Sequence, residues 1–465
     1  MKKYDVAVIG TGPGGYVAAI RAAQMGAKTI VFEKEEVGGV CLNWGCIPTK
    51  TLIYTAELYR KLQKAEELGL SINNISLNLP ALLKRKDAVI RRNKNGILSL
   101  FKAHGIELVK AEATLAGLGR IRANGDEIHA NSVIIATGSS PAQIRGLETD
   151  GQRIITSTEA LELEELPKKA LVIGAGAIGA EFACLWNIFG VDVTLVEMLP
   201  RVLPIADEEL SDMLAAIMRR RKMDVRTNTV VKRLDMNSNG VHVEFEGART
   251  EPIDVDLVLV GIGRRYHSDV VEDAQGIHVK RNDRGMILVD EHMETNVPGI
   301  YAIGDVTGKT MLAHGASAEG LVAVSNALGK SRRMDYKAIP ACTFTSPELA
   351  GVGLTEAKAR QSGVDVKVGK FSYQASGRAA TMGESDGLVK IVADARTDEV
   401  LGMHVIGPEA GELIGQGVIA MNLEATVAEL AHAVQTHPTL SESVMEAAED
   451  YYGMSIHTPP TRKGA

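Results

Sequence analysis

Apolar runs, glycine turns and alanine-rich stretches follow one another in the same order in two segments of the chain. Each segment predicts a buried strand, a tight turn, a helix and a second strand that ends at an acidic residue. The matching positions are residues 6–9 and 170–173, then Gly10, Gly12, Gly15 and Gly26 against Gly174, Gly176, Gly179 and Gly190, then Glu33 against Glu197. The spacing from the first glycine to the last glycine and to the acid is identical in both segments. We therefore expect two copies of one strand–helix–strand unit.

These two turns have the chemistry of dinucleotide-binding sites. Glycines, with Gly14 among them in the first turn, let the backbone approach a pyrophosphate, and the following helix directs N–H groups and partial positive charge toward it. An acid about 20 residues further along can accept hydrogen bonds from a ribose. The alternative is a pair of tight strand-to-helix turns that bind nothing, and the duplication makes this the weaker interpretation.

The rest of the chain divides at changes of composition and periodicity. A stretch containing Gly, Pro and Ser follows Thr137 and Gly138, and an acidic linker precedes Pro167, which predicts a boundary near residue 148. From about residue 340 the pattern changes to alternating strands such as 388–392, with helical stretches after Gly411 and Thr426. We expect an α/β protein with Rossmann-like domains over 1–147 and 148–265, a segment 266–340 that completes the first domain, and a C-terminal α+β domain over 341–465.

Composition and charge narrow the class of protein. The chain has 465 residues, of which 45% are hydrophobic and 23% charged, as in soluble multidomain proteins that fold throughout. Its formal net charge is -7 and its Lys and Arg residues are scattered, so we expect no nucleic-acid partner. No apolar run approaches the roughly 20 residues that span a bilayer. Because a strand-like run begins by Tyr4, we expect a cytoplasmic protein without a signal peptide or membrane segment.

The four cysteines are too few for a disulfide framework, but Cys41 and Cys46 form a close pair directly after the first unit. The pair opens a helical run, and Cα atoms five positions apart on a regular helix lie roughly 8 to 9 Å apart, beyond the disulfide limit of about 7 Å. A bridge therefore requires a distorted turn, which Gly45 and Pro48 permit, and such a bridge is readily reduced. The helix N-terminus and Lys50 would lower the thiol pKa, so we interpret the pair as redox-active.

Other interpretations of the cysteines and histidines are weaker. The alternatives at Cys41 and Cys46 are a zinc site or two buried thiols. No second cysteine or histidine pair with ligand spacing accompanies them, and no metal is predicted. Cys184 and Cys342 are isolated in apolar surroundings, and we interpret them as small core residues. Solvated surface positions are expected for His104, His129, His242 and His278.

Electron counting links the thiol pair to the two nucleotide sites. A nicotinamide delivers two electrons as a hydride, a disulfide accepts two electrons with protons, and a flavin can mediate between them. Because the first unit adjoins the cysteines in sequence, we expect it to hold FAD, with a sulfur able to touch the flavin ring. The second unit, which carries Glu197, is then expected to hold NAD.

The chain resembles the pyridine nucleotide disulfide oxidoreductase family over essentially its whole length. The resemblance rests on residues 41–50 (CLNWGCIPTK), 134–138 (IIATG) and 301–305 (YAIGD). It implies a glutathione-reductase-like fold, one non-covalent FAD per subunit, attack on substrate by Cys41 and flavin contact by Cys46. It also implies that Lys50 pairs with Glu181 near the flavin and that Asp305 binds the ribityl chain. Further cofactor contacts implied by the resemblance are Thr137, Gly138, Gly263, Ala313 and His314.

Within this family, residues 312–314, 377–384 and 437–442 resemble the members that oxidise dihydrolipoamide with NAD. Mercuric reductases carry a C-terminal cysteine pair, whereas the last cysteine here is Cys342. Soluble transhydrogenases lack one redox cysteine, and glutathione and trypanothione reductases place basic residues where this chain has Glu197. The alternatives are another NAD(P)H-dependent disulfide reductase, resembling those for glutathione or mercuric ion, and a flavoprotein subunit with a mainly structural role.

His437 is the candidate catalytic base, because a dihydrolipoyl thiol must lose its proton before it attacks a disulfide. Glu442 can accept the other ring N–H and fix the tautomer. From the residues alone, a capped loop before a helix at 440–448 explains Thr439, Ser441 and Glu442 equally well, and the resemblance favours catalysis. The resemblance also implies a homodimer in which His437 completes the site of the other subunit. Its expected partners are the lipoyl domains and acyltransferase core of a 2-oxo acid dehydrogenase complex, or a glycine cleavage carrier protein.

Overall fold

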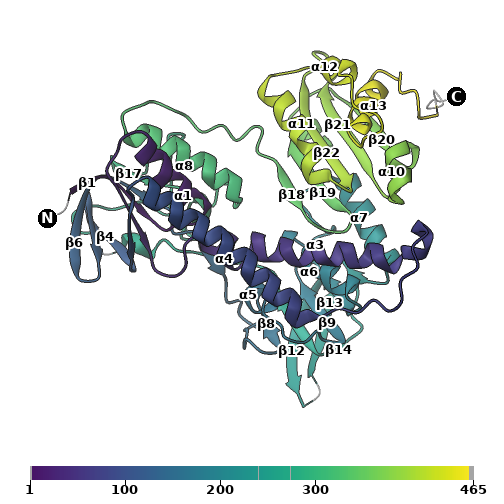
Figure 1. Ribbon diagram of the computed structural model, residues 1–465, viewed down its shortest axis with the longest axis horizontal. Helices are drawn as coiled ribbons and strands as arrows, with labels where there is room; N and C mark the ends of the chain where they lie inside the picture. Colours follow the sequence, from purple (N-terminus) through teal and green to yellow (C-terminus); the bar gives the residue numbers. More distant parts are fainter. Residues whose placement is uncertain (1–2, 239, 273, 460–465) are drawn as a thin grey trace.

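The computed structural model describes residues 3–459 except 239 and 273, and these form three lobes, each built on its own sheets (Figure 1). In Figure 1 the first lobe lies at the left, the second at the bottom and the third, in yellow and green, at the upper right. Among the described residues, no helix is long and apolar enough to cross a membrane.

The first lobe contains a seven-stranded sheet with helices packed on it. Its strands are β1 (Lys3–Ile9), β2 (Thr29–Glu33), β3 (Glu107–Lys110), β4 (Ala113–Gly117), β5 (Arg120–Ala123), β6 (Asp126–Ile135) and β17 (Ile300–Ala302). The order is β3-β2-β1-β6-β5-β4, and β17 lies parallel to β6, so part of the segment 266–340 joins this sheet. The helices are α1 (Pro13–Gln24), α2 (Gly39–Asn43), α3 (Cys46–Gln63), α4 (Leu79–Ala103) and α8 (Ala313–Ala327). Helices α1 and α8 pack side by side on one face of the sheet (Figure 1).

The second lobe repeats the parallel arrangement. Its parallel strands are β8 (Ile154–Ile155), β9 (Lys169–Ile173), β10 (Asp192–Val196), β11 (Asp224–Arg226) and β15 (Leu257–Val260), in the order β11-β10-β9-β15-β8. An antiparallel sheet of β12 (Thr229–Asn237), β13 (Gly240–Gly247) and β14 (Ile253–Val255) lies beside them, with helices α5 (Ser157–Ala160), α6 (Ala177–Ile188) and α7 (Glu208–Arg220). A ribbon of β7 (Ser139–Pro141) and β16 (Arg264–Tyr266) connects this lobe to the first.

The third lobe is an antiparallel sheet covered by helices. Its strands are β18 (Ala341–Thr343), β19 (Glu348–Gly353), β20 (Val366–Ser372), β21 (Leu388–Asp394) and β22 (Val400–Gly407), in the order β18-β19-β22-β21-β20. Its helices are α9 (Glu356–Gln361), α10 (Gly377–Met382), α11 (Ala410–Asn422), α12 (Val427–His432) and α13 (Glu442–Tyr451). The alternating strands and the helices expected after Gly411 and Thr426 are present in this lobe.

The two predicted glycine units have the same order of elements, β1-α1-β2 in the first lobe and β9-α6-β10 in the second. Their central strands are buried on both faces, which explains the continuous apolar runs in place of alternation. The turns require glycine because Gly10 and Gly174 have φ of 100° and 95°. A side chain at Gly15 or Gly179 would overlap the carbonyl oxygen of Gly10 or Gly174, so each helix packs directly against its turn.

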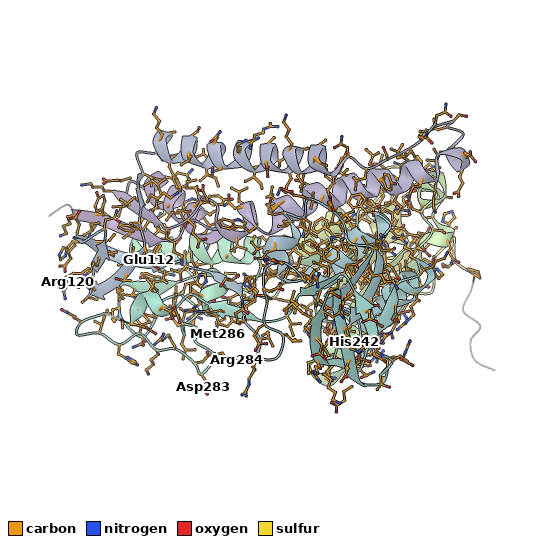
Figure 2. All side chains as sticks on the ribbon, turned by 90° about the horizontal axis from the view of Figure 1, so that it is seen from below. Glu112, Arg120, His242, Asp283, Arg284 and Met286 are labelled. Carbon is orange, nitrogen blue, oxygen red and sulfur yellow. The ribbon has the colours of Figure 1, made fainter. Side chains whose placement is uncertain are left out.

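The histidines expected at the surface are not buried. His278 is exposed, while His104, His129 and His242 are partly exposed. His242 projects from the outer side of the second lobe (Figure 2), where its Nδ1 lies 2.8 Å from Asp254 Oδ1. Cys184 is 3% exposed in the core of the second lobe, as expected for a small core residue.

The close packing at Gly15 gives a testable prediction. Gly15→Ala should lower the midpoint of thermal unfolding of the apoprotein by several degrees, because overpacking of this kind costs about 1–3 kcal/mol. Gly12→Ala is the matched control, since no heavy atom lies within 4 Å of the added Cβ and its backbone is in the extended region. Equal midpoints for the two variants would contradict the packing argument.

Candidate active site

A break between two helices brings Cys41 and Cys46 together. Cys41 lies in α2 and Cys46 is the first residue of α3, with Trp44 and Gly45 between the helices. Gly45 has φ -141° and ψ -110°, which is not a helical conformation. Asn43 fixes the end of α2 by donating from its side-chain amide to two backbone carbonyls at 2.9 and 3.1 Å. The expected distorted turn is therefore present, and it brings the two cysteines close enough for the Cys41 thiol to donate a hydrogen bond to Cys46 in the reduced protein.

The two thiols differ in acidity. The hydrogen bond from Cys41 lowers the pKa of Cys46 against the effect of burial, and the nearby Lys50 ammonium lowers it further. The same hydrogen bond, together with burial, raises the pKa of Cys41. Cys46 also begins α3, where the helix N-terminus stabilises a thiolate. In the reduced protein Cys46 therefore ionises first, and Cys41 keeps its proton.

Lys50 links the thiols to the second lobe. Its Nζ lies 2.8 Å from both carboxylate oxygens of Glu181, which comes from α6, and 4.7 Å from the centre of the Phe344 ring. The backbone N–H of Phe344, in the third lobe, donates to Glu181 at 2.9 Å. All three lobes thus meet at this ion pair, beside the thiols. The pairing that the family resemblance implied is seen directly in the geometry.

A cavity of about 1120 Å³ extends along the first glycine turn to the thiol pair. It is larger than the roughly 300–1,000 Å³ of most small-molecule pockets, which suits a dinucleotide. The N-terminal ends of α1 and α8 both border it, and a Cβ at Gly12 would project into open space. The expected site residues that line the cavity are Gly10, Gly12, Gly14, Gly15, Glu33, Cys41, Cys46, Lys50, Thr137, Gly138, Glu181, Asp305, Ala313 and His314.

The two acids that end the second strands make the same contacts in each unit. Glu33 accepts the Thr11 N–H at 2.9 Å and the Glu35 N–H at 2.9 Å. Glu197 is the first residue after β10, and it accepts the Ala175 N–H at 2.8 Å and the Leu199 N–H at 2.9 Å. Each carboxylate therefore ties the end of its strand to the glycine turn of the same unit.

The second unit reaches the cavity only in part. Its turn glycines, Glu197 and Gly263 do not line the cavity, whereas Ala177, Ile178 and Gly261 do. These three residues lie at the end occupied by Glu181, next to Lys50 and the thiols. A nucleotide held by the second unit could therefore place one end in the cavity while its adenosine end lies outside it.

Sequence reasoning missed a polar cluster at the β7–β16 ribbon. Arg264 donates to the Ser139 hydroxyl at 2.8 Å and carbonyl at 2.9 Å, and Ser139 donates to Asp305 at 2.5 Å. The His267 ring contacts the Thr137 carbonyl at 3.1 Å, and burial lowers the pKa of this imidazole. These contacts hold the connection between β6 and β7, which contains Thr137, beside Asp305. The one sequence feature that could have indicated this cluster is the pair of basic residues, Arg264 and Arg265, that follows the strand at 257–260.

Cys342 corrects one expectation from the sequence. It lines the cavity instead of lying wholly in a core, because it belongs to β18, the edge strand of the third sheet. Burial raises the pKa of this thiol, and the neighbouring carboxylate of Glu348 raises it further, so Cys342 stays protonated. Apolar neighbours in sequence could not indicate which side of an edge strand faces a cavity.

His437 and Glu442 form a pair at the start of α13. His437 Nδ1 lies 2.8 Å from Glu442 Oε1, while Glu442 Oε2 accepts the Thr439 N–H at 2.8 Å. The carboxylate thus serves as a histidine partner and as a local cap, which joins the two interpretations drawn from the sequence. The His437 side chain is 80% exposed, and neither residue lines the cavity. Within one chain, the structure does not bring this pair to the thiols.

Residues 4–320 match the family described as pyridine nucleotide-disulphide oxidoreductase, and residues 339–448 match the dimerisation domain of the same family. The chain belongs to the pyridine nucleotide-disulphide oxidoreductase family, whose members use flavin and pyridine nucleotide. It is 45% identical over 461 residues to the dihydrolipoyl dehydrogenase of Thermus scotoductus, covering 98% of this chain and 99% of that protein. It is 40% identical over 476 residues to the dihydrolipoyl dehydrogenase of Bacillus subtilis, covering 98% and 99%.

Solved structures give the same fold. LpdA from Mycobacterium tuberculosis superposes with a TM-score of 0.87 at 29% identity, covering 96% of this chain and 99% of that one. The HOCl-induced flavoprotein disulfide reductase RclA from Escherichia coli, as its Cu(II) complex, gives a TM-score of 0.85 at 29% identity, covering 97% and 99%. These similarities confirm the glutathione-reductase-like fold with a C-terminal dimerisation domain.

The role of Lys50 in thiol acidity can be tested directly. Lys50→Met should move the pH dependence of Cys46 alkylation in the reduced protein to higher pH, because it removes a positive charge that favours the thiolate. Alkylation at each cysteine is measured by peptide mass spectrometry across the pH range. Lys61→Met, at an exposed position of the same helix, is the control and should leave the profile unchanged. An unshifted profile in Lys50→Met would refute this role.

Proposed function

We propose that this chain catalyses the dihydrolipoyl dehydrogenase reaction, the oxidation of protein-bound dihydrolipoamide to lipoamide with reduction of NAD+ to NADH. The observation that carries the proposal is the thiol pair at the start of α3, beside a dinucleotide-sized cavity. The ion pair between Lys50 and Glu181 connects this helix to the second glycine unit. Relatives bearing that name match nearly the whole chain and support the same assignment.

The residues that line the cavity fit FAD. The first glycine turn and the N-terminal ends of α1 and α8 suit its pyrophosphate, Glu33 its ribose and Asp305 its ribityl chain. Thr137 and Gly138 border the same space, and Cys46 lies at its inner end. When bound, FAD supplies two-electron transfer between the thiol pair and a nicotinamide.

The thiol chemistry follows from the unequal acidities of the pair. The thiolate of a dihydrolipoyl group attacks Sγ of Cys41 in the oxidised pair, the S–S bond breaks, and Cys46 leaves as a thiolate. Its lowered pKa makes Cys46 the better leaving group. The second dihydrolipoyl thiol then attacks the mixed disulfide, which forms the cyclic lipoyl disulfide and releases Cys41 with a proton. The substrate loses two electrons, and the protein disulfide gains them.

His437 takes the proton of the attacking thiol in this proposal, with Glu442 holding its other ring nitrogen. Because His437 is exposed and lies outside the cavity of its own chain, it serves the thiol pair of a second subunit. The match of residues 339–448 to a dimerisation domain supports a homodimer. The partners proposed are lipoyl domains, either of a 2-oxo acid dehydrogenase complex with its acyltransferase core or of a glycine cleavage carrier protein.

Steady-state rates separate this function from the competing ones. Turnover with dihydrolipoamide and NAD+ should exceed turnover with glutathione disulfide and NADPH by orders of magnitude. A preference for glutathione disulfide would replace the proposal with a different disulfide reductase. If the flavin-loaded protein turns over neither dihydrolipoamide with NAD+ nor glutathione disulfide with NADPH, the result would indicate a flavoprotein subunit with a mainly structural role.

Nucleotide choice gives a prediction at Glu197. In this proposal its carboxylate, which accepts the Ala175 and Leu199 N–H groups, also accepts bonds from two ribose hydroxyls and repels a 2′-phosphate, so NAD+ should be preferred over NADP+. Glu197→Arg should narrow the difference in kcat/KM between the two nucleotides. Comparable kcat/KM values in the unmodified protein would count against the assignment.

The base is tested by His437→Gln. Dihydrolipoamide turnover should fall by roughly 100-fold or more, the scale of a lost general base, while flavin reduction by NADH stays near its original rate. His432→Gln is the control, because it changes an exposed histidine at the end of α12 in the same lobe. Heterodimers of Cys41→Ser with His437→Gln should recover activity through one intact site, and inactive heterodimers of verified composition would exclude sharing between subunits.

A further inference from the structure

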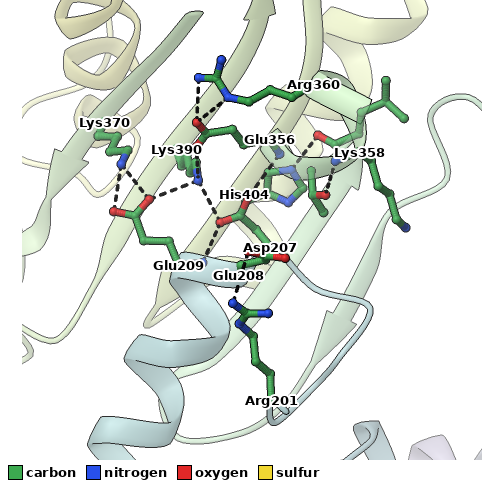
Figure 3. Close-up of polar contacts among 12 residues, drawn as sticks. Arg201, Asp207, Glu208, Glu209, Glu356, Lys358, Arg360, Lys370, Lys390 and His404 are labelled. Carbon is green, nitrogen blue, oxygen red and sulfur yellow. Dashed lines mark hydrogen bonds and ion pairs between the residues drawn. The ribbon is translucent and has the colours of Figure 1, made fainter. Parts of the chain in front are cut away.

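A row of basic residues crosses the third-lobe sheet where it meets the second lobe. Lys370 of β20 pairs in register with Lys390 of β21, and Lys390 pairs with His404 of β22. His404 is in turn opposite Gly351 of β19, where a Cβ would lie only 2.6 Å from the His404 ring. The row lies on one face of the sheet, directly over the N-terminal end of α7 (Figure 3).

Lys390 is the buried centre of this cluster. The residue is 2% exposed, and its Nζ lies 2.8 Å from Glu356, 3.0 Å from Asp207 and 3.1 Å from Glu209. An ammonium group has three N–H donors, and here each has a carboxylate acceptor. Asp207 and Glu209 belong to the second lobe, whereas Glu356 begins α9 of the third. The cluster is therefore an ionic contact between two lobes, in which Lys390 and Asp207 are buried and Glu209 lies closer to solvent.

The surrounding charges complete the cluster. Lys370 contacts Glu209 at 2.7 Å, and Arg360 donates twice to Glu356, at 2.8 and 3.1 Å. Three positive groups thus balance three carboxylates. His404 adds no charge, because burial lowers the pKa of its imidazole, and its Nε2–H donates to a backbone carbonyl at 2.9 Å. Removing Lys390 would leave the buried carboxylate of Asp207 without its charged partner, which is strongly unfavourable.

A loop of residues 198–207 connects Glu197 to α7, and Asp207 is its last residue. Several contacts hold this loop. Leu199 donates to Glu197 at 2.9 Å, Leu203 donates to the Ala175 carbonyl at 2.8 Å, the Val202 carbonyl accepts from the Ser211 hydroxyl of α7, and Asp207 meets Lys390. Ala175 lies in the second glycine turn, and Asp207 also caps α7 by accepting the Glu209 N–H at 3.2 Å. The contacts of Leu199 and Leu203 are made with the second dinucleotide unit, whereas the partner of Asp207 is supplied by another lobe.

We propose that Lys390 is a positioning residue for the pyridine nucleotide, acting from the third lobe through Asp207 on the loop 198–207. The inference rests on the proposed assignment of Glu197 to the nucleotide ribose. With Lys390 in place, the loop and the carboxylate beside it are ordered before the nucleotide arrives. Without it, the nucleotide must order the loop on binding, so affinity falls while the chemistry at the thiols and flavin is unchanged.

The test uses the flavin-loaded protein with Lys390→Met, Lys390→Arg and, as a matched control, Lys337→Met, which removes an exposed ion pair to Glu399 at 2.8 Å. Lys390→Met should raise KM for NAD+ by about 3- to 30-fold, the usual range for a residue that modulates a site from a distance. Its kcat for dihydrolipoamide at saturating NAD+ should stay within about twofold of the unmodified value. Lys390→Arg should restore much of the affinity, and Lys337→Met should behave as the unmodified protein.

Two further measurements keep the inference falsifiable. Amide hydrogen exchange in 198–207 should accelerate selectively in Lys390→Met, and Asp207→Asn, which keeps the helix cap, should raise KM in the same direction. A lowered unfolding temperature with unchanged KM and unchanged exchange in the loop would show a structural tie only and overturn the inference. Failure of the proposed function is distinguishable, because the unmodified protein would then show no dihydrolipoamide turnover, whereas the loop exchange and direct NAD+ titration still report on Lys390.

Discussion

The ion pair between Lys50 and Glu181 is the contact on which the arrangement of this protein depends. It joins the helix that begins at Cys46 to the first helix of the second dinucleotide unit, and the Phe344 N–H from the third lobe completes it. Because Glu181 is 7% exposed, loss of the lysine would leave a nearly buried carboxylate with one backbone donor. The pair also places a positive charge within reach of the thiols. One interaction therefore contributes both to the relative position of the lobes and to the acidity of Cys46.

The lobes contribute to the site at different levels. The first supplies the thiols and the cavity, and the second meets that cavity at the Glu181 end. The third holds the second in place through contacts that include two separated points. These points are Phe344 beside the ion pair and the buried cluster around Lys390. The second dinucleotide unit is therefore held at Glu181 of α6 and at Asp207 of the loop 198–207. These two contacts keep a fixed distance between that unit and the thiols, which two-electron transfer between them requires.

The sequence was most informative where chemistry and local structure coincide. The repeated glycine units, the distorted turn at Cys41 and Cys46 and the strands and helices of the third lobe are all present. Contacts between distant segments were accessible only through family resemblance, as for Lys50 with Glu181, or were missed, as for Arg264 and Lys390. Periodicity identifies the buried face of a strand but does not name what covers it. For that reason Cys342 was wrongly expected in a core, and the Lys390 row gave no signal at all.

The central claim is that electrons from dihydrolipoyl groups enter through Cys41 and Cys46 and leave on NAD+. The most direct measurement starts with anaerobic mixing of the oxidised, flavin-loaded protein with a stoichiometric amount of dihydrolipoamide. One sample is taken before addition of NAD+ and one after it. Each sample is alkylated, and peptide mass spectrometry measures the alkylation of each cysteine. We predict that dihydrolipoamide increases alkylation of Cys41 and Cys46 but not of Cys184 or Cys342, and that this increase is absent from the sample alkylated after NAD+ addition, in which an equivalent amount of NADH has formed. Formation of NADH with these two cysteines unchanged throughout would contradict the account.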